Sequence, residues 1–448
     1  MEIVSIVDEG LGHSSHVVDL GDGRVLVVDP ARLPDQERRL VADRGWKIAW
    51  TVDTHSHADY ISGSFELAAE GARFLAPARA RLEVDHHGVQ PGEELEVGDG
   101  IGLRAIATPG HTPEHLAYLL QRDGVPVALF SGGSLMVGTV GRTDLLGVEQ
   151  APALARELHR ALHTEILTLP DDLAVYPTHG AGSFCSAPGT ADRTTTIGRE
   201  RATNPLCAVA DEDEFVERLL GGLGSYPTYF RMLPERNRRG PRVYARVPTL
   251  DRLAPSMAAE QVAAGAVLVD ARPITRFAAG HPAGAVSNAL RGVFGSWLGW
   301  LVPLDTAIIF LLDDDQARDD LVRQSLRVGH EHLLGEVDGG FAAWTAAGLP
   351  TSTIPLVEPH ELVGTVLDVR QAGEWASGHV PGATHVELGA IPRARTPGGL
   401  VTVMCGHGER AMTAASLMAA GGRSELGVLA GGPDDWSAAT GTALEIGP

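Results

Sequence analysis

The chain has 448 residues, which exceeds one ordinary core, because domains usually run about 100 to 200 residues. With 44% hydrophobic and 21% charged residues, its composition is typical of a globular protein and excludes a disordered chain. The 57 acidic residues outnumber the 36 basic ones and give a formal net charge of −21, which would repel a phosphate backbone. We therefore expect two or three folded domains and no nucleic acid partner.

The distribution of apolar residues and cysteines bears on the compartment. No apolar run approaches the roughly 20 residues needed to cross a bilayer, and the opening segment MEIVSIVDEGLGHSSH lacks a basic region followed by an apolar one. Cys185, Cys207 and Cys405 are odd in number and widely spaced, which does not indicate a disulfide framework. We expect a cytoplasmic protein with reduced thiols and no membrane partner; assembly into a homo-oligomer stays open.

The first half of the chain alternates strand and helix patterns. Residues 17–30, VVDLGDGRVLVVDP, predict a β-hairpin around a Gly-Asp-Gly turn. Apolar strands follow at 48–54, 101–108, 126–132 and 173–178, and ALARELHRAL at 153–162 has helical periodicity. This mixture predicts the α/β class.

Polar residues of the metal-ligating type follow three of these strands. His55, His57 and Asp59 leave the first strand at alternate positions, so an extended segment turns all three to one side. His111 lies in the segment PGHT after a second strand, and His179 follows a third. A lone histidine is more often structural, but the set together indicates a metal centre.

The second half contains an internal repeat. VLVDARPITRFAAGHPAGAVSN from Val267 matches VLDVRQAGEWASGHVPGATHVE from Val366, and each copy spans about 100 residues. Residues 236–248, RNRRGPRVYARVP, suit a boundary before the repeat, and AAGLPTSTIP suits the join between copies. We predict one domain over residues 1–240 and two smaller α/β domains over 241–350 and 351–448.

The last copy carries a cysteine at a strand end. The strand LVTVM at 400–404 runs into Cys405 and a glycine-bearing loop, and the helical stretch AMTAASLMAA begins after Arg410. Backbone N–H groups at a helix start favour thiolate over thiol, so Cys405 can attack a sulfane sulfur beside the Arg410 guanidinium. The alternative is a buried structural thiol. The loop residues expected to bind the substrate are Gly406, His407, Gly408 and Glu409.

The middle copy differs in this loop. Its segment IIFLLDDDQARDD places Leu312 near the cysteine position and follows it with Asp313, Asp314 and Asp315. An acidic loop without a thiol would repel an anionic sulfur compound. We predict that this copy is not catalytic.

The motifs of the first domain, THSHAD, TPGHT and PTHGAG, resemble those of the metallo-β-lactamase superfamily. The segments DEGLGHSSHVVDLGDGRVLVVDP, GRTDL and TTIGRERATNP look like those of the persulfide dioxygenases, including forms fused to rhodanese domains. The resemblance implies a metallo-β-lactamase αββα sandwich followed by two rhodanese-like domains. It also implies Fe(II) held by two histidines and one aspartate, and oxidation of a low-molecular-weight persulfide such as glutathione persulfide.

Carried over onto this sequence, the resemblance implies His55 and His111 as ligands, but Gly133 stands where the family has its aspartate. The substitution leaves His55, His57 and His111 as the expected metal ligands, with Zn(II) as the alternative to Fe(II). Asp59 and His179 are expected as outer partners or weaker ligands. Tyr60 replaces the last histidine of the dinuclear HxHxDH motif, which makes a two-metal hydrolase the less favoured interpretation.

The loop of the last copy resembles the rhodanese pattern C-x-x-G-x-R at Cys405, Gly408 and Arg410. Three functions therefore stay open. The first is persulfide oxidation at the metal site coupled to sulfane-sulfur transfer through Cys405. The second is sulfur transfer alone, with a metal-binding but non-oxygenase first domain. The third is a zinc-dependent thioester or lactone hydrolase.

Overall fold

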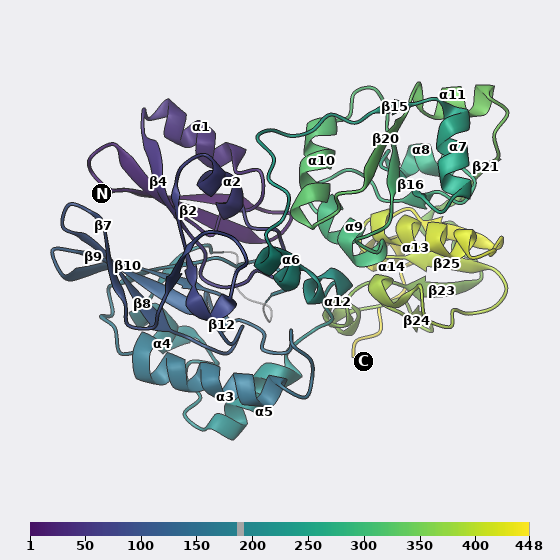
Figure 1. Ribbon diagram of the computed structural model, residues 1–448. Helices are drawn as coiled ribbons and strands as arrows, with labels where there is room; N and C mark the ends of the chain where they lie inside the picture. Colours follow the sequence, from purple (N-terminus) through teal and green to yellow (C-terminus); the bar gives the residue numbers. More distant parts are fainter. Residues whose placement is uncertain (186–191, 448) are drawn as a thin grey trace. The chain divides into compact units, whose positions relative to one another are not determined.

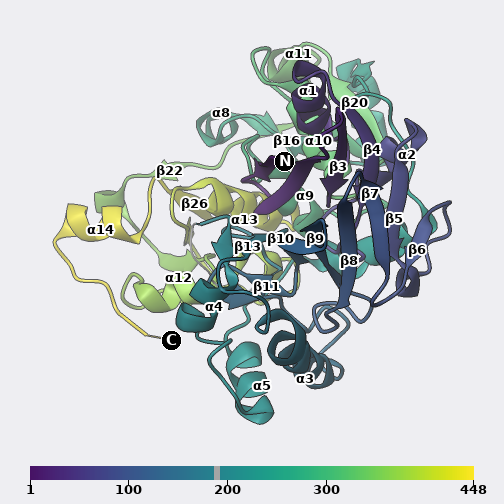
Figure 2. The same ribbon diagram turned by 90° about the vertical axis from the view of Figure 1, so that its left-hand side faces the viewer.

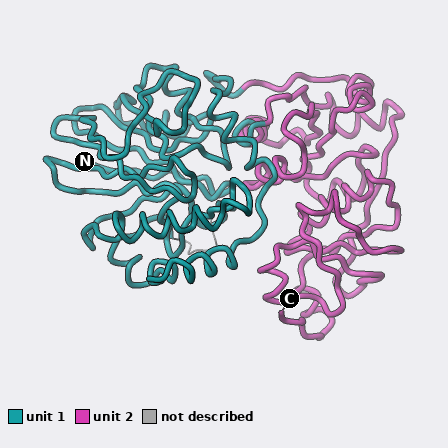
Figure 3. Tube along the Cα trace, turned by 60° about the horizontal axis from the view of Figure 1, so that its bottom comes forward, with its two compact units in different colours: residues 1–247, 326–329 teal, residues 248–325, 330–448 magenta. Residues whose placement is uncertain are grey.

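The computed structural model describes residues 1–185 and 192–447, and the chain divides into two compact units (Figure 3). The first unit holds Met1–Val247 with the short segment Leu326–Gly329, and the second holds Pro248–Ser325 with His330–Pro448. Both units mix strands and helices, which confirms the predicted α/β class. The predicted domain boundaries after residues 240 and 350 stay predictions.

Two six-stranded sheets form the centre of the first unit. In spatial order the first sheet contains β1 (Ile3–Asp8), β2 (His13–Asp19), β3 (Arg24–Val28), β4 (Lys47–Val52), β5 (Arg73–Pro77) and β6 (His87–Val89). The second contains β14 (Thr195–Thr196), β13 (Ala174–Pro177), β10 (Val125–Gly132), β9 (Leu116–Arg122), β8 (Ile101–Ala107) and β7 (Glu94–Gly98), and a small ribbon pairs β11 (Leu135–Met136) with β12 (Thr139–Val140). The expected hairpin is present as antiparallel β2 and β3.

Helices cover the outer faces of these sheets (Figures 1 and 2). Those beside the first sheet are α1 (Asp35–Asp43) and α2 (Ser64–Ala69), and those beside the second are α3 (Ala151–Ala161), η2 (Leu162–Ile166), α4 (Ile197–Thr203) and α5 (Glu212–Gly221). The short elements η1 (Ala78–Ala80), η3 (Thr228–Arg231) and α6 (Leu233–Arg239) complete this unit. Layered in this way, helix, sheet, sheet and helix form the expected αββα sandwich.

Alternation along the strands explains the layers. In β3, Leu26 and Val28 point into the core between the two sheets, where they join Leu120 and Phe130 of the second sheet. Val25 and Val27 point outward and pack in one cluster with Val41 of α1 and Leu67 of α2. A strand buried on both faces has to be apolar at successive positions, and RVLVV satisfies that requirement.

The second unit contains two five-stranded sheets of the same design. The first has the order β15 (Arg252–Leu253), β20 (Leu333–Val337), β19 (Ile308–Leu311), β16 (Val267–Asp270) and β18 (Val286–Ser287). The second has the order β22 (Leu356–Val357), β26 (Leu426–Leu429), β25 (Val401–Met404), β23 (Thr365–Asp368) and β24 (Thr384–His385). A ribbon pairs β17 (His281–Pro282) with β21 (Thr351–Ser352).

The helices of this unit follow the same order in both copies. Those of the middle domain are α7 (Pro255–Ala263), α8 (Ile274–Ala279), α9 (Phe294–Leu301), α10 (Arg318–Arg327) and α11 (Gly340–Ala346). Those of the last domain are η4 (Pro359–Glu361), α12 (Ala372–Ser377), η5 (Leu388–Ala390), α13 (Glu409–Ala420) and α14 (Pro433–Thr440). Equal strand order in the two sheets confirms the internal repeat. Across the residues described, none of the helices has both the length and the apolar surface that a bilayer crossing demands.

Candidate metal centre and sulfur-transfer loop

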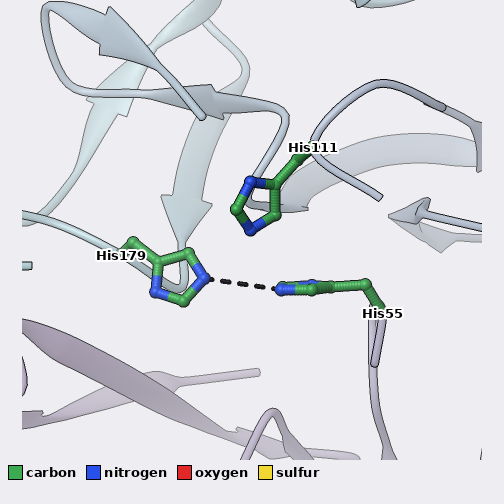
Figure 4. Close-up of side chains that lie close together, drawn as sticks. All are labelled: His55, His111 and His179. Carbon is green, nitrogen blue, oxygen red and sulfur yellow. Dashed lines mark hydrogen bonds between the residues drawn. The ribbon is translucent and has the colours of Figure 1, made fainter. Parts of the chain in front are cut away.

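Three histidines of the first unit meet at one edge of the sandwich because each follows the carboxyl end of a strand. His55 comes after β4, His111 after β8 and His179 after β13. Their ring nitrogens lie within 4.8 Å of one another, and all three side chains are buried. His179 Nε2 lies 3.5 Å from His55 Nε2, with the His111 ring facing the same space (Figure 4). Three converging imidazoles are a donor set suited to a transition metal.

His57 and Asp59 belong to neighbouring sets instead. His57, Asp59 and His179 have ligand atoms within 4.8 Å of one another, as do Asp29, Asp53 and His57. His57 Nε2 lies 3.2 Å from Asp29 Oδ1. The sequence placed His57 with His55 and His111, whereas the structure gathers His179 with them. Which of these sets holds an ion stays a prediction.

Unsatisfied buried atoms in these sets support a bound ion. In the part of the chain that the structure describes, His57 Nδ1 and His111 Nε2 are buried without a hydrogen-bond partner. His179 Nδ1 and both carboxylate oxygens of Asp59 are also buried without a hydrogen bond, although His179 Nδ1 lies 3.3 Å from Asp59 Oδ2. Buried polar groups are nearly always satisfied, and leaving one unpaired costs about 1 to 3 kcal/mol. Imidazole nitrogens and a carboxylate therefore fit a metal ion chemically.

The protonation states suit metal binding as well. Burial lowers the pKa of His111 to about 3 and holds the pKa of His55 well below its usual value. Burial opposes ionisation of Asp59, but the adjacent His179 and His57 outweigh it and lower the Asp59 pKa to about 2. At neutral pH His55 and His111 therefore offer neutral imidazoles and Asp59 offers an ionised carboxylate, the forms that bind metals.

The space at Gly133 is filled by the imidazole of His111. A Cβ atom at this position would lie 2.3 Å from His111 Cδ2, closer than real contacts allow. The Gly133 N–H also donates a 2.8 Å hydrogen bond to His115 Nε2. The His115 ring stacks on the His55 ring, with 4.9 Å between the ring centroids. The aspartate expected from the resemblance could enter here only if His111 moved.

Asp29 is a site residue that the sequence interpretation did not single out. It follows β3 with φ of +48°, is fully buried, and accepts hydrogen bonds from Thr54 N at 2.7 Å and from the Thr178 hydroxyl. In this way it ties the loop after β4 to the loop after β13. The rule that found His55, a polar residue directly after an apolar strand, would also have found Asp29 in VLVVDP.

The loop of Cys405 joins β25 to α13. Gly408 has φ of +101°, which favours glycine, and its N–H donates to Cys405 Sγ at 3.1 Å. The Cys405 residue is 1% exposed, so it is buried, yet its sulfur faces a backbone donor at the first turn of a helix. Of the other loop residues, Gly406 and Glu409 are half-buried and His407 is exposed.

Arg410 is held by a carboxylate. Both of its terminal nitrogens donate to Glu374 of α12, at 2.7 Å each. Burial opposes the charge of Arg410, but this bidentate pair outweighs it and raises the pKa of the guanidinium. A Cβ at Gly406 would lie 3.6 Å from Arg410 Nη2, so the guanidinium lies next to the loop. The Arg410–Glu374 pair therefore fixes the loop to α12.

The comparisons with known proteins agree with this division of the chain. The rhodanese-like domain model matches residues 254–347 and 356–439. Persulfide dioxygenase ETHE1 of Homo sapiens is 30% identical over 204 residues, which are 44% of this chain and 71% of the human protein. The chain belongs to the persulfide dioxygenase family. The predicted resemblance, with rhodanese-like domains following the first unit, is confirmed.

Two further relatives delimit the similarity. Hydroxyacylglutathione hydrolase of Pseudomonas putida strain GB-1 is 32% identical over 210 residues, 43% of this chain and 80% of that protein. The crystal structure of a metallo-beta-lactamase from Staphylococcus aureus subsp. aureus COL superposes with a TM-score of 0.64 and 26% identity, covering 75% of this chain and 98% of that one. That share exceeds the first unit, so the structural likeness continues into the rhodanese-like part.

Proposed function

We propose that this protein is a persulfide-processing sulfurtransferase in which Cys405 carries sulfane sulfur and the first unit supplies a metal centre. The observation that carries the proposal is the hydrogen bond from Gly408 N to Cys405 Sγ at the start of α13. A helix N-terminus favours negative charge on a thiolate and then on a persulfide in the same place.

The transfer step conserves atoms and charge. The Cys405 thiolate attacks the outer sulfur of thiosulfate, an S–S bond forms, and the donor's S–S bond breaks with its electron pair leaving on sulfite. An acceptor thiolate then attacks the terminal sulfur of the Cys405 persulfide, takes that sulfur as a new persulfide and restores the Cys405 thiolate. A low-molecular-weight persulfide such as glutathione persulfide can serve as donor in the same way.

For the metal centre of the first unit we propose persulfide oxidation as the first candidate reaction. His55, His111 and His179 would hold the ion, and the Asp59 carboxylate lies beside them, 3.3 Å from His179 Nδ1. Fe(II) bound there would supply dioxygen chemistry, and Zn(II) would supply Lewis-acid chemistry. The oxidative reaction turns a persulfide, dioxygen and water into a thiol, sulfite and two protons, so sulfur is oxidised and dioxygen is reduced. Similarity to the human persulfide dioxygenase favours this assignment.

A zinc-dependent hydrolase is the second candidate for the first unit, and a specific observation favours it. The imidazole set of His55, His111 and His179 contains no carboxylate, and the carboxylate position at Gly133 is filled by the His111 ring. Three histidines with an open position are a common catalytic zinc site. Similarity to the Pseudomonas hydroxyacylglutathione hydrolase is consistent with this candidate.

One set of measurements on the full chain separates these functions. Purified protein is assayed for bound iron and zinc, for oxygen uptake with glutathione persulfide, and for hydrolysis of a hydroxyacylglutathione. Iron with oxygen uptake supports the oxygenase, whereas zinc with thioester hydrolysis supports the hydrolase. If the protein binds metal but shows neither activity, and sulfur is still transferred through Cys405, we conclude that it is a sulfurtransferase whose first unit is not an oxygenase.

Variants then identify the ligands. We expect His111→Ala and His179→Ala to lose most of the bound metal, since each removes one of three converging nitrogens. His87→Ala is the matched control, because His87 is exposed and pairs with Glu93 outside the site. Retention of full metal content in His179→Ala together with its loss in His57→Ala would restore the ligand set expected from the sequence.

The role of the missing aspartate has its own pair of variants. Gly133→Ala adds a Cβ that collides with the His111 ring, so bound metal should fall. Gly133→Asp adds the same Cβ and a carboxylate. If Gly133→Asp gains iron and oxygen uptake that Gly133→Ala lacks, the carboxylate itself limits the native site.

A further inference from the structure

The loop between β4 and α2 supplies three residues of the candidate metal-binding sets. His55, His57 and Asp59 all lie in this loop. His57 and Tyr60 belong to no helix or strand, so their backbone groups stand outside any regular hydrogen-bonding ladder. Buried backbone groups nevertheless need partners. The position of these ligands therefore depends on what holds the loop from other parts of the unit.

The side chain of Asn237 holds this loop at three backbone groups. Its amide nitrogen donates to the carbonyl of His57 at 2.9 Å and to the carbonyl of Tyr60 at 3.0 Å. Its amide oxygen accepts from the N–H of Ser62 at 3.0 Å, and the residue is only 3% exposed. An asparagine carries two donors and an acceptor on one short side chain, so this single residue satisfies all three groups.

Asn237 reaches the loop from a distant part of the chain. It lies in α6 and belongs to the segment 236–248, which by its sequence suits a domain boundary. The preceding element η3 adds a fourth contact, because the buried Tyr229 donates its hydroxyl to the carbonyl of Asp59 at 3.2 Å. Both η3 and α6 therefore hold the loop through its backbone.

Contacts of this kind act on metal affinity without touching the ion. Ligands bind an ion tightly when the folded chain already holds them in the bonding geometry, because less ordering then remains to be done on binding. Asn237 fixes the peptide after His57 and the peptide after Tyr60, so Asp59 lies between two held points. Loss of the amide would release the backbone on both sides of that carboxylate.

We propose that Asn237 and Tyr229 are positioning residues of the metal centre, which raise its metal affinity by holding the loop at residues 55–62 in its binding form. The inference rests on the metal centre proposed for the first unit and adds two residues from outside the ligand sets. Partners that hold metal ligands in place typically contribute about 10- to 100-fold in affinity. The segment that follows the sandwich is thereby part of the metal centre, although it supplies no ligand.

The test measures Zn(II) binding to the full chain after bound metal has been removed with a chelator. Asn237→Ala should raise the Kd for Zn(II) about tenfold or more, because three buried backbone groups lose their partner. Asn237→Leu keeps a similar side-chain volume without a donor or acceptor and should show the same loss. Tyr229→Phe removes only the fourth contact and should raise the Kd about two- to fivefold.

Bound Co(II) provides a second measurement that a loss of stability alone would not change. Its visible absorption depends on the ligands and their geometry. We expect an altered Co(II) spectrum in Asn237→Leu, because the loop that carries His55, His57 and Asp59 is no longer held. Tyr229→Phe should shift the spectrum in the same direction by a smaller amount.

Asn204→Ala is the matched control, since Asn204 is a buried asparagine of the same unit with as many hydrogen bonds. Its amide nitrogen donates to Thr139 and Glu200, and its amide oxygen accepts from the N–H of Leu206. This variant should keep the Zn(II) affinity and the Co(II) spectrum of the wild type. An equal loss of affinity in Asn204→Ala overturns the inference, because the effect would then report a general loosening of the unit.

The remaining outcomes separate this inference from the proposed function. Unchanged Zn(II) affinity in both Asn237 variants overturns the inference and leaves the metal centre standing. Wild-type affinity in Asn237→Leu alone also overturns it, because packing would then be responsible. If circular dichroism shows that neither variant folds, Tyr229→Phe decides, and an unchanged Kd there overturns the inference. Absence of Zn(II) binding from the wild type overturns both the inference and the proposed metal centre.

Discussion

The middle and last domains are two copies of one fold that have kept the same buried ion pair. In the middle copy Arg272 donates to Asp270 at 2.6 Å and to the carbonyl of Gly280 at 2.9 Å. The last copy repeats this arrangement with Arg370, Asp368 and Gly378, at 2.7 Å for both contacts. In each copy the arginine joins the aspartate at the end of a central strand, β16 or β23, to the backbone carbonyl that follows the next helix, α8 or α12. The fold is therefore maintained by residues that take no part in the chemistry.

The copies differ at the end of the next strand. β16 pairs Asp270 with Leu311, and β23 pairs Asp368 with Met404, so Leu312 and Cys405 occupy equivalent positions. In the middle copy Gln316 accepts from the backbone N–H of Asp313 and donates to the carbonyl of Ala271. The Gln316 side chain thus cross-links the loop of the middle copy by hydrogen bonds. In the last copy the loop instead directs the Gly408 N–H to the Cys405 sulfur.

Among the described residues of the middle copy, no ion pair is equivalent to the one between Arg410 and Glu374. By the sequence repeat, Glu374 corresponds to Arg276, and Arg410 corresponds to Ala317. Arg276 is mostly exposed and lies 3.9 Å from Asp313, which is a loose surface contact. A handful of positions in one loop thus separates the copy that carries a cysteine from the copy that lacks one.

The largest effect should follow from Cys405→Ser, because the thiolate is the sulfur-carrying atom of the proposal. We expect sulfur transfer from thiosulfate to cyanide to fall about a thousandfold or more, as in loss of other nucleophiles. Mass spectrometry should detect an added sulfur on the wild type after exposure to thiosulfate and none at this position in the variant. Cys207→Ala, in the core of the first unit, should keep the activity. Normal transfer by Cys405→Ser would contradict the assignment.

The shared ion pair predicts equal losses of stability in the two copies. Asp270→Asn and Asp368→Asn each leave a buried arginine without its carboxylate, so each should lower the free energy of unfolding by about 3 to 5 kcal/mol. Chemical denaturation followed by circular dichroism measures the loss. A change below about 1 kcal/mol in one copy alone would show that the two copies are not built alike.

A smaller effect should distinguish the unshared ion pair. Glu374→Gln removes a bidentate but partly exposed contact and should cost about 1 kcal/mol, whereas Arg276→Gln in the middle copy should cost less than about half of that. Thermal unfolding of both variants beside the wild type measures the difference. Equal costs would mean that the Arg410 contact does not anchor its loop.

The smallest effect is expected from placing a thiol in the copy that lacks a cysteine. Leu312→Cys, made in the Cys405→Ser background, should show no sulfur transfer above that background, because Gln316 already accepts the Asp313 N–H and the acidic loop would repel a persulfide anion. The thiocyanate assay measures this outcome directly. Recovered transfer would show that a thiol alone is sufficient and that the loop geometry has no role.

Much of this protein is predictable from local sequence. The mixture of strand and helix patterns predicted the α/β class, and the resemblance to the metallo-β-lactamase superfamily implied the sandwich of the first unit. The repeated segment from Val267 and Val366 predicted two copies of one α/β domain. The cysteine between β25 and a helical stretch predicted the loop at a helix start. These features depend on strand periodicity, glycine at a positive φ and helix initiation, all of which act between residues close along the chain.

Tertiary structure alone decided which side chains meet. The convergence of His179 with His55 and His111, the filling of the Gly133 position by an imidazole, and the closure of the Arg410 fork by Glu374 join segments separated by tens of residues or more. The contact of Asn237 with the loop after β4 is of the same kind. Spacing along a sequence determines which face a residue occupies, but the packing of whole layers determines what lies opposite that face.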